Sequence, residues 1–349
     1  MLRNRFTTLR AVAVAAVALA LGVGTLTAPA SAATNNRGLY GAPNEYASVT
    51  LQSQAILGLI SNGIVPSKSA VSWLAKQQCA NGSFQAYRAD TTVPCPASDP
   101  VNFSGPTVDQ TAWALMALEA SGQQAAADKA TRWLQNNTSK DANGLTGFSS
   151  YPGSAPDANS TGLAYAALIG NGASKSVTNP LRRFLGSLVT SCDQARGGAS
   201  LYQSAVPGAN NAASAQSFFG LTATLPTYTV SDLRANPRCG KDAVNKLGSY
   251  LSGQIATDQV LTYYPYDGDD FGNTALTVVG FTSAGIGKGA VATATTGLKA
   301  NARAWALKDG KPNAGALGLL LMVSEATGSN AKKFGGVNLI SELQKSETK

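Results

Sequence analysis

Segments that turn from polar to strongly apolar recur along the chain at intervals of about fifty residues. The clearest are TVDQTAWALMALEASG (107–122), DANSTGLAYAALIGNG (157–172) and DFGNTALTVVGFTSAG (270–285). Each opens with a helix-capping residue type, has Thr at its fifth place and ends in glycine. Weaker copies begin at residues 48, 210 and 313. Six such segments, apolar on most faces, predict six helices that are buried all round.

The ends of these segments carry helix signals. All six first residues belong to the types whose side chains accept hydrogen bonds from free N–H groups at a helix start: Ser48, Thr107, Asp157, Asn210, Asp270 and Asn313. Five segments end in a glycine, which adopts a left-handed C-cap most easily: Gly63, Gly122, Gly172, Gly285 and Gly328. The apolar stretches are therefore predicted to be complete helices with defined ends.

A more amphipathic segment follows each buried one and predicts a second, half-exposed helix. Four of these segments contain an aromatic residue followed by leucine: Trp73-Leu74, Trp133-Leu134, Phe184-Leu185 and Tyr250-Leu251. Six helix pairs over residues 48–349, after a lead-in at 33–47, predict an all-α fold, an (α/α)6 toroid with six inner and six outer helices. An open solenoid is the alternative, and closure is favoured because no repeat has an obviously polar capping face.

The N-terminal segment precedes the repeats and differs from them. Three arginines open it, an apolar run covers residues 11–26, and Ala-Pro-Ala-Ser-Ala follows at 28–32. This order is typical of a secretory signal peptide, and we predict that residues 1–32 are one and that the mature protein is secreted. A membrane anchor is the alternative, but the run is short for a span and no stop-transfer charges follow it.

Composition excludes several classes of protein. The net charge of +8 includes the three N-terminal arginines, and no basic block or zinc-finger spacing indicates nucleic-acid binding. The chain contains no histidine, so a Ser-His-Asp triad, a Cys-His pair and any His-containing zinc site are excluded. We expect no metal, no cofactor and no membrane span in the mature chain.

Four cysteines form an even set, which in an oxidising compartment indicates disulfides. Three pairings are possible. We favour Cys79 with Cys95 and Cys192 with Cys239, because each pair lies within neighbouring sequence. A metal-binding set is the alternative, although no pair has the C-x2-C spacing.

Parts of the chain resemble a known superfamily. QTAWALMALEASG (110–122) resembles a repeat of the squalene and oxidosqualene cyclases. Leu74-x3-Gln78-x3-Gly82-x-Phe84 is similar to the Gln-Trp motif of the terpene cyclase and prenyltransferase superfamily, with Phe where Trp is usual. The resemblance covers the repeats, implies the toroid fold, and is weak for activity. Among such relatives, zinc prenyltransferases need His and thioester domains need Cys followed by Glu-Gln, and this chain has neither.

The resemblance also implies a place for a catalytic acid. Class II terpene cyclases carry an Asp-x-Asp-Asp-Thr-Ala motif at the start of an inner helix. This chain has Asp267, Asp269 and Asp270, but three residues intervene before Thr274-Ala275. If the protein is cyclase-like, these three aspartates are its candidate catalytic residues, with one as general acid.

Inner helices of a toroid share one direction, so their N-termini gather at one mouth and attract negative groups. Helix capping is the simplest role for the acids there, including Asp109, and loop acids can also be merely solvated or bind Ca2+. Tyrosines combine flat apolar faces with hydroxyls, as ring-ligand sites often do, or they pack in the core. The ligand-binding candidates are Tyr263, Tyr264, Tyr266, Asp267, Asp269, Asp157 and Trp113.

Motifs of the fold persist in this chain while residues that carry its chemistry are displaced or absent. We therefore expect a secreted, non-catalytic protein that binds a small apolar or ring-containing ligand or a partner. A class II terpene cyclase with an Asp general acid is the first alternative. A polysaccharide hydrolase that uses two of the mouth carboxylates is the second.

Overall fold

The computed structural model of the protein describes residues 36–223 and 228–349. The predicted signal peptide lies outside these residues. Alternate helices along the described chain form an inner layer: α2 (Ser48–Ser61), α4 (Val108–Ala120), α6 (Ala158–Gly170), α8 (Asn211–Thr222), α10 (Phe271–Ala284) and α12 (Ala314–Ala326). The helices between them form an outer layer: α3 (Lys68–Lys76), α5 (Gln124–Asn136), α7 (Lys175–Ser187), α9 (Ala243–Asp258), α11 (Lys288–Ala306) and α13 (Leu339–Lys345).

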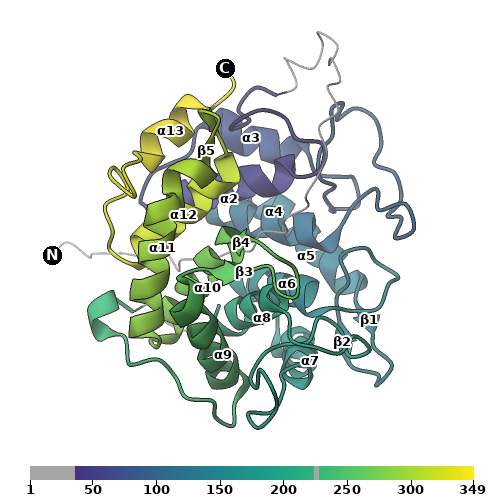
Figure 1. Ribbon diagram of the computed structural model, residues 1–349. Coiled ribbons are helices and arrows are strands. Elements are labelled where there is room, and N and C mark those ends of the chain that lie inside the picture. The colour runs from purple at the N-terminus through teal and green to yellow at the C-terminus, as the bar shows by residue number, and fades with distance from the viewer. Residues whose placement is uncertain (1–35, 224–227) are drawn as a thin grey trace, which may run out of the picture.

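The inner helices form a closed ring. Each packs against the next in sequence, and α12 packs against α2, so the sixth repeat returns to the first (Figure 1). Each outer helix packs against the inner helix that precedes it. The fold is therefore an all-α toroid of six helix pairs, and the open solenoid is excluded.

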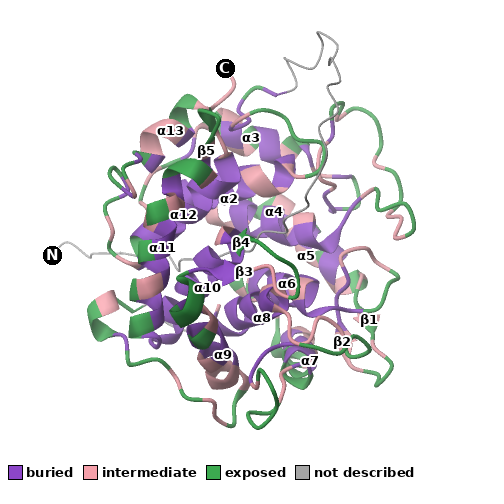
Figure 2. Ribbon diagram, in the orientation of Figure 1, coloured by how far each residue is buried: buried purple, intermediate pink, exposed green. Residues whose placement is uncertain are grey.

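Burial follows the two layers. The inner helices are buried along almost their whole length, while the outer helices have a buried side and an exposed side (Figure 2). The predicted aromatic-leucine pairs lie on the buried side of α3, α5, α7 and α9; Trp73 and Leu74, for example, are 2% and 0% exposed. The ring closes tightly at α2 and α12, where a Cβ on Gly318 would overlap the carbonyl oxygen of Gln54.

Five of the six predicted N-caps are confirmed. Thr107, Asp157, Asn210, Asp270 and Asn313 each accept a hydrogen bond from the backbone N–H three residues later. The prediction for Ser48 is wrong: Ala47 is the N-cap of α2 and has no side-chain cap bond. The Ser48 hydroxyl instead makes two hydrogen bonds with the backbone of Asn44. It accepts the Asn44 N–H at 2.6 Å and donates to the Asn44 carbonyl at 2.8 Å. All five predicted C-terminal glycines have positive φ.

The threonine at the fifth place of the repeat has a structural role that the sequence did not reveal. Thr274 Oγ1 donates to the carbonyl of Asp270 at 2.6 Å and accepts the N–H of Leu261 at 2.8 Å. The corresponding hydroxyls of Thr111, Thr161 and Ser214 accept backbone N–H groups in the same way. Each hydroxyl thus ties the segment before an inner helix to the first turn of that helix.

Short strands and loops connect the helix pairs. Three antiparallel two-residue pairs occur in the described chain: β1 (Ser139–Lys140) with β2 (Thr146–Gly147), β3 (Leu261–Thr262) with β4 (Asp269–Asp270), and β5 (Leu307–Lys308) with β6 (Lys311–Pro312). A 3-10 turn, η1 (Val230–Asp232), lies in the connection between α8 and α9. The segment 38–41 also pairs with 346–348, through bonds such as Gly38 N–H to the Thr348 carbonyl at 2.7 Å. This pairing joins the two ends of the ring.

Both predicted disulfides are confirmed. Cys79 is bonded to Cys95, and Cys192 is bonded to Cys239, with Cα atoms 5.7 and 5.8 Å apart. The first closes the loop that follows α3, and the second joins the loop after α7 to the segment before α9. Over residues 36–223 and 228–349, none of the helices has the length and apolar character that a membrane crossing requires.

Candidate functional site

All six inner helices begin at one end of the ring, because an outer helix returns the chain after each of them. We call this end the N-terminal mouth. It holds the acids that the sequence predicts, and two of them are the N-caps of their helices. Asp157 is 2% exposed and accepts the Ser160 N–H at 2.8 Å. Asp270 is 1% exposed and accepts the Asn273 N–H at 3.0 Å.

Burial raises the pKa of both carboxyl groups. It raises the pKa of Asp157 to about 7, and the neighbouring carboxyl of Asp109 raises the same pKa further while the Ser160 donors oppose the shift. Burial raises the pKa of Asp270 to about 6, against the opposing effect of its two bonds from Asn273. Near neutral pH both groups are therefore protonated to a larger extent than an ordinary aspartate.

Asp109 and Asp157 form a pair of interacting carboxyl groups at the start of α4 and α6. Asp109 Oδ2 accepts the hydroxyl of Ser150 at 2.9 Å. Its other oxygen, Oδ1, is buried and has no hydrogen-bond partner within the described chain. Burial raises the pKa of Asp109 as well. Sequence reasoning placed both acids at the mouth but could not show that two separate repeats bring them close enough to interact.

Asp270 belongs to a different network. Asn273 Nδ2 donates to its carboxylate at 2.5 Å, and Asn273 Oδ1 accepts from Gln216 Nε2 at 3.1 Å. The last acid of the predicted motif is thus enclosed in a buried chain of amides that links α10 to α8. Asn273 therefore completes a structural contact between the N-cap of α10 and the helix α8.

The other acids of the motif lie in a hairpin. Asp269 is exposed and pairs with Thr262 across β3 and β4, and Asp267 is exposed in the turn between the strands. The hairpin lies in front of the middle of the ring in Figure 1, and Figure 2 shows its turn as exposed. The structure therefore separates the three aspartates into one buried cap and two solvent-facing groups.

The three tyrosines differ from one another in environment. Tyr266 is 75% exposed. Tyr264 is half-buried, and the guanidinium of Arg196 lies over its ring, 3.8 Å from the ring centroid. The sequence did not predict this contact with Arg196. Tyr263 is half-buried, and burial raises its pKa to about 12 with a further contribution from Asp270. Tyr266 is thus the tyrosine of the hairpin that faces solvent, whereas Trp113 is 1% exposed and packs inside the core.

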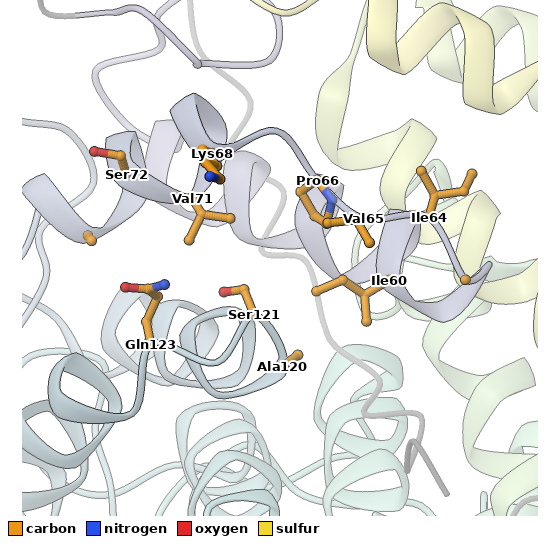
Figure 3. A pocket seen from close by; sticks show the side chains of 12 residues that line it. Ile60, Ile64, Val65, Pro66, Lys68, Val71, Ser72, Ala120, Ser121 and Gln123 are labelled. Carbon is orange, nitrogen blue, oxygen red and sulfur yellow. The ribbon is translucent and has the colours of Figure 1, made fainter. Parts of the chain in front are cut away.

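A second feature, absent from the sequence predictions, lies at the opposite end of the inner helices. A hollow of about 540 Å3 opens between the C-terminal ends of α2 and α4 and the helix α3 (Figure 3). We call it the C-terminal hollow. It is lined by Ile60, Gly63, Ile64, Val65, Pro66, Lys68, Val71, Ser72, Ala75, Ala120, Ser121 and Gln123. Most of these side chains are apolar, and Lys68 is the one charged residue among them.

One signal in the sequence could have indicated the hollow. Val65 lies two residues after the predicted C-cap at Gly63 and is 89% exposed, although its side chain is aliphatic. Because Val65 borders the other apolar residues of the hollow, it forms part of a contiguous apolar surface of the kind that marks binding sites. The hollow itself is a space that three helices leave between them, and the packing of helices from two repeats cannot be read from a local residue pattern.

Among residues 36–223 and 228–349, no group of three or more His, Cys, Asp or Glu side chains is placed to hold a metal ion. Two features of the described chain carry the functional hypotheses below: the buried carboxyl groups with raised pKa at the N-terminal mouth, and the apolar hollow at the other end.

Comparisons with known proteins give the following distant similarities. No protein-family model matches the chain, and no curated protein matches it. The structure of the type II terpene cyclase MstE from Scytonema (apo) is 13% identical, with 73% of this chain and 67% of that chain covered and a TM-score of 0.44. A protein from Actinoplanes is 14% identical, with 85% and 98% covered and a TM-score of 0.46. Neither likeness shows the family, and the toroid rests on the helix contacts described above.

Proposed function

We propose that this protein is a secreted, non-catalytic toroid that binds a small apolar or ring-containing ligand in the C-terminal hollow. The observation that carries the proposal is the hollow itself, about 540 Å3 in volume and lined mainly by aliphatic side chains. Small-molecule sites in proteins are typically concave, mostly apolar and about 300 to 1,000 Å3 in volume. The hollow therefore has the size and chemistry of a ligand site.

The wall of the hollow is held in place before any ligand arrives. Asn62 Nδ2 donates to the carbonyl of Leu321 on α12 at 2.8 Å and to that of Gly58 at 3.0 Å. The Ile64 N–H donates to the Leu59 carbonyl at 3.0 Å. These bonds fix the turn that carries Ile64 and Val65. A preformed wall lowers the ordering cost of binding and favours a preorganised site.

Two further observations support the non-catalytic and secreted parts of the proposal. No aspartate or glutamate lines the hollow, so a ligand there meets no carboxyl group able to act as general acid or base. The two disulfides are typical of proteins that leave the reducing cytosol, as the N-terminal signal-peptide pattern predicts.

Fluorescence titration with N-phenyl-1-naphthylamine, an uncharged aromatic probe, tests the proposal. We expect one site with a dissociation constant of about 10 to 200 μM, as the binding energy per atom of drug-sized ligands predicts. Val71→Trp fills the hollow from α3 and should abolish binding. Ala292→Trp adds the same side chain on the exposed face of α11 and should leave binding unchanged. Equal binding by both variants, with helical circular dichroism intact, would show that the hollow is not the site.

Acid catalysis is the second candidate, and one observation favours it. The pKa of Asp157, raised to about 7 beside the unpaired oxygen of Asp109, suits a proton donor at neutral pH. Under this second hypothesis, the protein is a terpene cyclase-like enzyme that protonates an apolar substrate at the N-terminal mouth. Turnover of squalene or a polyprenyl diphosphate that Asp157→Asn abolishes would establish it, whereas loss only in Asp269→Asn would assign the acid to the hairpin instead.

A further inference from the structure

The C-terminal hollow has an uneven distribution of charge. Lys68 lies in the first turn of α3 and is exposed at the rim, and every other lining residue is uncharged. Figure 3 shows Lys68 next to Val71 on the wall formed by α3, with Ser121 and Gln123 on the facing wall formed by α4 and the turn after it. The apolar interior is thus bordered by one positive group and a few neutral polar groups.

The ammonium group of Lys68 is not neutralised by a neighbouring acid. Within residues 36–223 and 228–349, the one ion pair joins Lys345 and Glu342. Glu347 comes near the start of α3, but its carboxylate accepts the hydroxyls of Ser67 and Ser69 rather than the Lys68 amine. The carboxylate of Glu347 therefore lies at the N-terminus of α3, where a helix favours negative charge. The positive charge of Lys68 stays available to a ligand.

Polar groups around Lys68 suit an anion. Ser72 lies four residues after Lys68 on the same face of α3, and both side chains line the hollow. Across the opening, the exposed amide of Gln123 also lines the hollow and can donate a hydrogen bond. An ammonium with neutral donors close by recognises a single negative group, because charge-assisted hydrogen bonds are stronger than neutral ones.

From this arrangement we propose that the ligand is an apolar molecule with a single anionic group. Its apolar body lies among Ile60, Val71, Ala75 and Ala120, and its anionic group lies at the rim beside Lys68. The proposal rests on the proposed function, since it specifies the chemistry of a ligand for the same hollow. It excludes apolar cations as preferred ligands, because Lys68 would repel them.

Two probes that differ in one group test the proposal. 1-Anilinonaphthalene-8-sulfonate has the ring system of N-phenyl-1-naphthylamine with one added sulfonate. We expect the wild-type protein to bind the anionic probe more tightly than the uncharged one. Lys68→Met should lower the ratio of the two affinities by about two- to five-fold, the effect expected when an exposed charge pair is lost. Lys68→Arg should keep most of the ratio.

The matched control is Lys76→Met, which removes the same charge from the exposed last turn of α3, outside the hollow. It should leave the affinity ratio unchanged. Added salt should weaken binding of the anionic probe to the wild-type protein and have a smaller effect in Lys68→Met. An equal loss in both variants, or no change in Lys68→Met, would overturn the anionic-ligand proposal. If the wild-type protein binds neither probe, the proposed function itself fails.

Discussion

Asp157 gives the most specific prediction about stability. Its carboxyl group is buried at the start of α6, and its pKa is about 7 in the folded protein, against 3.8 for an ordinary aspartate. Between these two values the folded state holds a proton that the unfolded state has lost. Stability therefore falls as the pH rises from about 4 to about 7, and the full cost is present above pH 7. The substitution Asp157→Asn removes this titration and keeps an amide oxygen that caps the helix equally well.

The size of the effect follows from the pKa difference. About three pKa units at about 1.4 kcal/mol each correspond to about 4 kcal/mol, which is an upper value because water entry and local relaxation relieve part of the burial cost. We expect Asp157→Asn to raise the free energy of unfolding by about 2 to 4 kcal/mol at pH 8. At pH 4 the two proteins should be nearly equal in stability, since the carboxyl group is protonated in the folded protein.

Urea unfolding followed by tryptophan fluorescence, repeated from pH 4 to pH 8.5, measures this difference. Asp242→Asn is the matched control, because Asp242 caps the outer helix α9 from an exposed position. Its pKa is lowered by bonds from Asn245 despite some opposing burial, so its replacement should destabilise the protein slightly at neutral pH. The reasoning about Asp157 is refuted if Asp157→Asn leaves the pH dependence unchanged or lowers stability at pH 8.

Three further predictions concern the ring and can be measured by the same unfolding experiment. Gly318→Ala should destabilise the protein by about 2 kcal/mol or more, because the added Cβ meets the backbone of α2 where the ring closes; a neutral result would contradict the tight packing. Thr274→Val should cost about 1 to 3 kcal/mol, because it leaves a buried N–H of β3 without its acceptor, whereas Thr274→Ser should retain most of that stability. Replacing Cys192 and Cys239 together by Ser should cost about 4 kcal/mol, since their disulfide closes a loop with a sequence separation of 47, and a loss below about 1 kcal/mol would argue against that account.

Most of the fold was predictable because its signals are local and repeated. Capping residues, terminal glycines and apolar periodicity defined the inner helices, and the aromatic-leucine pairs marked four of the outer ones. The disulfides followed from sequence proximity. The prediction of Ser48 as an N-cap failed although its residue type was suitable. Its hydroxyl forms hydrogen bonds with the backbone of Asn44, four residues earlier, and makes no cap bond.

The candidate site was less predictable because it depends on relations between repeats. The sequence placed Asp109 and Asp157 at one mouth, but their coupling depends on how close α4 and α6 bring them. The sequence predicted a capping role for Asp270 alone among the three acids of the hairpin, but it gave no measure of burial: Asp270 is 1% exposed, while Asp267 and Asp269 face solvent. The C-terminal hollow has no residue signature beyond the exposed side chain of Val65.

The proposal that the C-terminal hollow binds the ligand is tested most directly by photolabelling. An aryl-azide derivative of N-phenyl-1-naphthylamine, activated on the intact protein, marks the peptides that line its binding site. The account predicts label on residues 60–75 and 120–123, lost in Val71→Trp. Label on the hairpin at 261–270, or equal labelling of Val71→Trp and wild-type protein, would contradict it.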